Sequence, residues 1–204
     1  MSERKLARVV LSLFLQLCVL ALLVSASAVV CSAATPGSAD LGANVRALNN
    51  RVLGLHAQAQ QASGESGQSV LRTQAVAALQ QRAAALSKLI QNDPQQALAL
   101  AFSPEALAEL AARFPDSAAL LEAHATLSGP IERWIWDSAD LKSHRTQVLI
   151  KIGQSRSVEL HFAGPGESAL SSGDVVEASG VLVGSTMVVS SSTVHHVATD
   201  GTAR

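Results

Sequence analysis

Residues 146–162, TQVLIKIGQSRSVELHF, decide the fold class of this chain. Side chains suited to a core recur at every second position on both sides of Gly153, as they do in strands with one buried face. The short link Gly153–Ser155 between the two runs is typical of a β-hairpin. The stretch therefore predicts two neighbouring antiparallel strands.

Three further strand patterns flank this hairpin, at residues 131–136, 175–183 and 187–190. Turn signals at Gly173–Asp174 and Gly184–Ser185 separate them. Five short strands in this order predict a small antiparallel β barrel of the OB type over residues 124–198. Residues 199–204 follow as a tail. Only a loop, residues 163–173, occupies the place where many OB barrels carry a helix.

The chain before this region has a helical period. In residues 35–68, a helical segment and linker, apolar side chains recur in steps of four and three: Leu41, Val45, Leu48, Val52, Leu55 and Ala59. Residues 62–69, ASGESGQS, form a polar break. Residues 69–123 form a helical subdomain whose first helix runs from about Val70 to Asn92. Asp93–Pro94, Ser103–Pro104 and Pro115–Asp116 predict the starts of shorter helices. The fold class is therefore α+β.

Residues 1–34 have the layout of an export signal. Arg4, Lys5 and Arg8 precede an apolar run, and small residues follow it. We expect cleavage after Ala34, which makes the protein periplasmic or secreted.

Two alternatives leave the protein on a membrane. Residues 9–30 approach the roughly 20 apolar residues that cross a bilayer, so an uncleaved N-terminal transmembrane helix would tether the chain. Cys31 would be the lipid-bearing residue of a lipoprotein, although Val30 stands where bacterial lipoprotein signals carry a small residue. In both cases the positive-inside rule places the rest of the chain outside the cell membrane.

Composition excludes several function classes. The formal net charge is −1, and three of the bases lie in the signal, so the remainder is more acidic than the whole chain. An acidic body argues against a nucleic-acid partner. The two cysteines are Cys18 and Cys31, and cleavage after Ala34 leaves none. A disulfide framework, a thiolate zinc site and a cysteine nucleophile are then excluded together.

Two stretches resemble a known family region: RAAALSKLIQNDPQQALALAF (82–102) and ELHFAGPGESALSSGDVVEASGVLVG (159–184). They are similar to the non-catalytic, prodomain-like N-terminal region of large secreted bacterial proteins such as gametolysin-like metallopeptidases. The chain contains no H-E-x-x-H motif, so no peptidase residue carries over. The resemblance implies a leader or accessory module.

Trp134 and Trp136 are the best candidate binding residues. Two apart on a strand, they share one face, while Ile131, Arg133 and Ile135 take the other. If the isoleucines fill the core, the indoles form an exposed platform for sugars, peptides or bases. The alternative is that one or both indoles pack beneath the helical half, because large aromatic side chains usually serve packing.

No other cluster predicts catalysis, a metal or a cofactor. His195 and His196 are adjacent on a strand, so they point to opposite faces and chelate poorly. Asp137 and Asp140 flank a predicted turn, where aspartates are common. We therefore expect no enzyme but an exported accessory module that binds or shields another envelope or secreted protein. The alternative is an OB-like module that recognises a glycan or peptide over Trp134 and Trp136.

Overall fold

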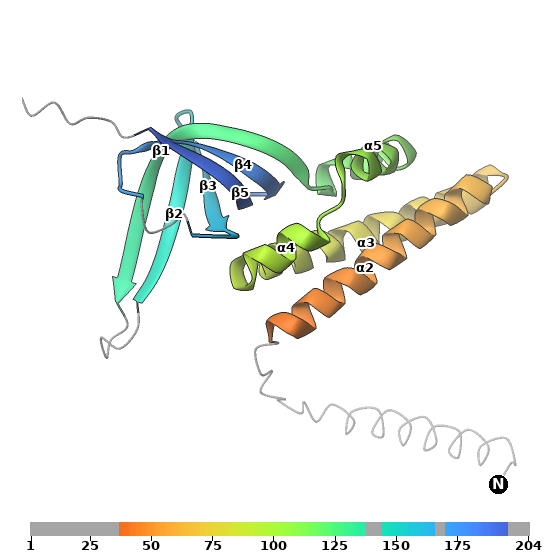
Figure 1. Ribbon diagram of the computed structural model, residues 1–204. Coiled ribbons are helices and arrows are strands. Elements are labelled where there is room, and N and C mark those ends of the chain that lie inside the picture. The colour runs from red at the N-terminus through yellow and green to blue at the C-terminus, as the bar shows by residue number, and fades with distance from the viewer. Residues whose placement is uncertain (1–36, 138–143, 166–169, 196–204) are drawn as a thin grey trace, which may run out of the picture. The chain divides into compact units, whose positions relative to one another are not determined.

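The computed structural model describes residues 37–137, 144–165 and 170–195 (Figure 1). The predicted export signal or anchor, residues 1–34, and the tail, residues 199–204, lie outside the described residues. Within the described part, no helix is long and apolar enough to cross a membrane.

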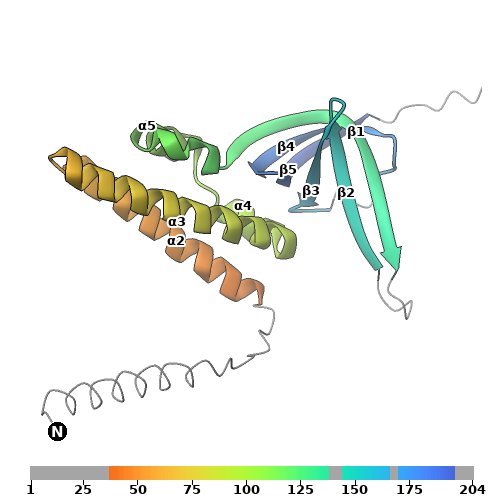
Figure 2. The same ribbon diagram turned by 180° about the vertical axis from the view of Figure 1, so that it is seen from behind.

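Two long helices open the described chain, α2 (Ser38–Gln61) and α3 (Glu65–Asn92), and they lie side by side (Figure 2). The apolar stripe predicted on α2 is buried along its whole length, which confirms the helical period. α3 begins at Glu65, earlier than the predicted start near Val70. The polar break is only a tight turn at Gly64, whose φ of 103° favours glycine. Gly67 is accommodated in the first turn of α3.

Shorter helices follow as the prolines predict: α4 (Pro94–Leu100), α5 (Pro104–Arg113) and the 3-10 helix η1 (Pro115–Leu120). Asp93 accepts a hydrogen bond from Gln96 N at 2.9 Å, and Ser103 Oγ accepts one from Ala106 N at 3.3 Å. Each side chain thereby caps a backbone amide that has no partner inside its helix.

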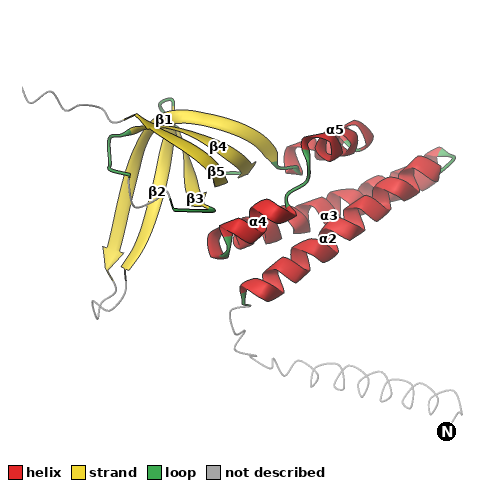
Figure 3. Cartoon of the chain, in the orientation of Figure 1, coloured by secondary structure: helices red, strands yellow, loops and turns green. Residues whose placement is uncertain are grey.

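Five strands then form a closed barrel in the order β1-β2-β3-β5-β4, so the fold is α+β (Figure 3). They are β1 (Ala123–Asp137), β2 (His144–Ile152), β3 (Arg156–Phe162), β4 (Val175–Val183) and β5 (Thr186–His195). The arrangement is compatible with the expected OB-like barrel. The prediction of a purely antiparallel barrel is wrong, because β3 and β5 pair in parallel, with Leu160 opposite Met187. Side-chain alternation is the same for either direction of pairing, so the sequence pattern does not reveal this contact.

β1 begins at Ala123, well before the predicted start at Ile131. Glycine and proline are uncommon inside strands, yet Gly129 and Pro130 lie inside β1 and pair with β4. The backbones pass very close there, since a Cβ on Gly129 would lie 2.1 Å from Lys151 O. Only glycine fits this position.

Two sets of buried side chains hold the barrel. One fills its interior and includes Ile131, Val148, Ile150, Leu160 and Met187. The other joins apolar residues of α2, α3 and α4 to Val181, Val183 and Val188 of β4 and β5. A third set, with Leu79, Phe102 and Phe114, packs α2, α3 and α5 together.

Candidate functional site

The end of β1 leaves the barrel together with the start of β2. β1 pairs with β4 from Ala123 to Pro130 and with β2 from Ile131 to Asp137. β2 pairs with β3 only from Val148 onward. Residues 134–137 and 144–147 therefore pair only with each other, and we call them the ribbon. Figure 1 shows this two-stranded arm extending past the other strands.

The ribbon carries exposed apolar side chains on both faces. Trp134 is 50% exposed and Trp136 is 46% exposed. Their rings are nearly parallel, with an interplanar angle of 15° and 6.3 Å between the ring centroids. Ile135, on the opposite face, is 57% exposed. Ile131 fills the barrel core as expected, but Ile135 does not, because β1 has left the barrel by then. Packing of the indoles beneath the helical half is not observed.

Polar groups surround the indoles on their own face. The register places Gln147 opposite Trp134 and Arg145 opposite Trp136, so both donors share the face of the rings. At the base of the ribbon, Lys151 Nζ lies 2.5 Å from Glu132 Oε1. An aromatic pair flanked by hydrogen-bond donors can bind a flat or extended ligand.

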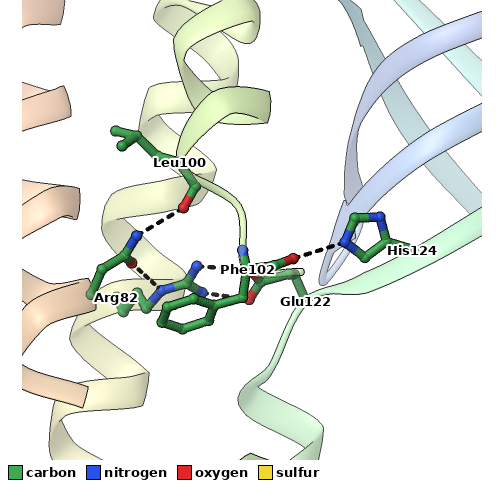
Figure 4. Close-up of polar contacts among 6 residues, drawn as sticks. Arg82, Leu100, Phe102, Glu122 and His124 are labelled. Atoms are coloured by element: carbon green, nitrogen blue, oxygen red, sulfur yellow. Dashed lines mark hydrogen bonds and ion pairs between the residues drawn. The ribbon is translucent and has the colours of Figure 1, made fainter. Parts of the chain in front are cut away.

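A second cluster of polar side chains lies inside the molecule (Figure 4). This cluster was not predicted from the sequence. Arg82 of α3 donates two hydrogen bonds to the Glu122 carboxylate, one of them of 2.7 Å from Nη2 to Oε1. It also donates from Nε to Asn49 Oδ1 at 2.6 Å. The side chains of Arg82 and Glu122 are only 1% and 0% exposed. Asn49, Arg82 and Glu122 form what we call the buried polar cluster.

The buried polar cluster ties the helices to the first residues of β1. Phe102 N, in the link between α4 and α5, donates to Glu122 Oε1 at 2.8 Å, and its ring lies 3.8 Å from the Arg82 guanidinium carbon. The ring nitrogen Nε2 of His124 lies 2.8 Å from Phe102 O, and Asn49 Nδ2 donates to Leu100 O at the same distance. A pair buried this completely has no access for a substrate, so its role is structural.

The sequence did contain one signal for Arg82. It lies three residues after Leu79 and four before Leu86, on the apolar stripe of its own helix, and both leucines are buried. A charged residue on such a stripe needs a buried partner. Glu122 carried no comparable signal, because it lies in the link before β1.

The remaining surface of the described chain offers no second constellation. No group of three His, Cys, Asp or Glu residues in residues 37–137, 144–165 and 170–195 is placed to hold a metal. A hollow of about 580 Å³ lies beside the start of α3, but its walls are polar and include both Arg72 and Asp116. The exposed ribbon is therefore the candidate site.

Comparison of the chain with models of protein families, with curated proteins and with solved structures finds no match. The resemblance to the N-terminal region of secreted bacterial metallopeptidases therefore stays a prediction from the sequence.

Proposed function

We propose that this protein is a non-catalytic accessory module that binds another protein through its ribbon. The observation that carries the proposal is the exposure of Trp134, Ile135 and Trp136 on opposite faces of one short arm. Exposed large aromatics are expensive to leave in water and are typical of the centres of protein interfaces. An arm that exposes apolar side chains on both faces fits a partner that contacts both of them.

The proposed compartment rests on the sequence of residues 1–34. Their charge and apolar pattern supports export, and the partner is then another envelope or secreted protein. If the segment is retained, residues 9–30 tether the same module to the membrane. A prodomain-like role, in which the ribbon shields a surface of its partner, is one form of this binding.

The proposal is tested by affinity capture from the envelope fraction of the native cells. The bait is the exported protein, and the matched control is the Trp134→Ser/Trp136→Ser double variant. We expect a discrete protein that the wild type retains and the variant loses, while both baits are folded at the temperature of the experiment. Equal retention by a folded variant would contradict the proposal.

A glycan ligand is the second candidate, favoured by one specific arrangement. The two nearly parallel indoles lie on one face, with Gln147 and Arg145 opposite them to donate hydrogen bonds. Sugars bind to such aromatic surfaces through their apolar faces. A shift of indole fluorescence with soluble oligosaccharides, lost in Trp134→Ser, would favour this candidate over a protein partner. A glycan ligand does not explain why Ile135 is exposed.

A further inference from the structure

The backbone of β1 reveals which way its hydrogen-bonding groups point at the base of the ribbon. Ile131 N donates to Asp174 O at 2.9 Å, and Gly173 N donates to Ile131 O at 3.0 Å. Arg133 N donates to Ser172 Oγ at 2.9 Å. These partners lie on the side of β1 that faces away from β2. Because this direction alternates along an antiparallel pair, every second residue of β1 points its N–H and C=O to that side.

The same alternation continues into the ribbon. It directs the backbone groups of Ile135 and Asp137 away from β2, beyond the last contact with residues 170–174 at Arg133. Among the described residues, none bonds to these groups, which we call the open edge. Trp134, Ile135 and Trp136 carry no charge, and no proline or bulge interrupts them, so only the charge of Asp137 and the shortness of the edge protect it.

The chemistry of the open edge selects its occupant. Donors and acceptors that repeat at every second residue match the backbone of another extended polypeptide and do not match a sugar or a lipid. The indoles on one face and Ile135 on the other would then cover alternate side chains of the added strand. We propose that β1 binds an extended segment of a partner protein along Ile135–Asp137, as an additional antiparallel or parallel strand with apolar residues at alternate positions.

This inference rests on the proposed function and names the way in which the partner is held. A second copy of the chain is a poorer occupant. Two such edges paired about a two-fold axis offer only the backbone groups of Ile135 and Asp137 from each copy, whereas a specific, stable interface buries roughly 1,200 Å² or more. A different partner can add contacts of its own beyond the edge.

The experiment uses the full chain and a phage library of random peptides about ten residues long, the upper length of ordinary strands. Enriched peptides are synthesised and titrated against wild type, Ile135→Pro and Thr146→Pro. Proline at 135 removes the open-edge donor and leaves the bonds to β2 in place. Thr146 is the cross-strand neighbour of Ile135, so proline there alters the opposite edge of the same ribbon.

We expect the enriched peptides to bind at least about tenfold more weakly to Ile135→Pro, because a peptide carbonyl loses its donor. Thr146→Pro should weaken binding less than Ile135→Pro, because it leaves the Ile135 N–H in place. In wild type, peptide binding should slow amide exchange at Ile135 and Asp137 by at least about tenfold, as hydrogen-bonded closure does. This readout does not depend on the folding of any variant.

Three results would overturn the inference, and they separate it from the proposed function. Peptides that need Trp134 and Trp136 but protect neither Ile135 nor Asp137 leave the proposed function standing and exclude the added strand. A wild-type dimer that Ile135→Pro converts to a monomer makes the occupant a second copy. The absence of any enriched peptide counts against both proposals.

Discussion

Arg82 and Glu122 are charged and buried, whereas Trp134 and Trp136 are large, apolar and half exposed. The buried pair is satisfied by Asn49 and by the backbone of Phe102, so its charges are compensated within the fold. The indoles contact each other but extend beyond the barrel. The difference teaches that the polar cluster serves the fold and the apolar ribbon does not. Substitutions in the buried polar cluster should therefore lower the free energy of unfolding much more than substitutions in the ribbon.

Glu122→Gln should give the largest loss of stability. It removes the charge that compensates Arg82 in a fully buried site, and breaking such a buried pair costs about 3–5 kcal/mol. Urea unfolding followed by circular dichroism measures the change. The Arg82→Met/Glu122→Leu double variant should recover part of the loss, since no unpaired charge remains. A loss below about 1 kcal/mol in Glu122→Gln would show that the cluster does not hold the fold.

A pair of isoleucines in the same two strands sharpens the comparison. Ile150 of β2 is 0% exposed, and Ile150→Ala should cost about 2–5 kcal/mol through the cavity it leaves. Ile135→Ala, on the ribbon, should cost less than about 1 kcal/mol. The same unfolding experiment compares them. Equal losses would mean that the ribbon packs against another part of the chain.

The indole pair should contribute little to folding. Trp134→Ser/Trp136→Ser should lower the free energy of unfolding by no more than about 1.5 kcal/mol, because an aromatic pair adds about 0.5–1.5 kcal/mol. Calorimetry measures the change. A loss as large as that of Ile150→Ala would move the indoles from the binding surface to the core.

The exposed ion pair at the base of the ribbon should have the smallest effect. The side chains of Lys151 and Glu132 are 45% and 38% exposed, so water competes for both charges. Lys151→Met should change stability by only about 0.2–1 kcal/mol. Thermal unfolding at low and high salt checks this value. A loss comparable to that of Glu122→Gln would erase the distinction between the buried and the exposed pair.

Side-chain period was enough to predict most of the elements. The steps of four and three from Leu41 to Ala59 describe a helix face, and alternation around Gly153 describes a hairpin. Period could not predict how far β1 extends, because Gly129 and Pro130 look like a break unless the neighbouring strand is known. Nor could it predict that β5 runs parallel to β3, which depends on the path of the connecting chain.

The candidate site was predicted in part. The spacing of Trp134 and Trp136 placed both rings on one face, but the exposure of that face depends on where β1 leaves the barrel. Beyond that point neither face of β1 lies against the barrel core, so Ile135 is as exposed as the indoles. The partner of Arg82 was not predictable, since Glu122 is 40 residues away in the sequence.

Indole fluorescence of the folded protein tests the central claim most directly. The chain has two tryptophans and no tyrosine, so the emission reports on the ribbon alone. We predict efficient acrylamide quenching of the folded protein, because about half of the surface of each indole is exposed. A blue-shifted, protected emission that moves to the red on unfolding would contradict the account, because it would place Trp134 and Trp136 inside the fold.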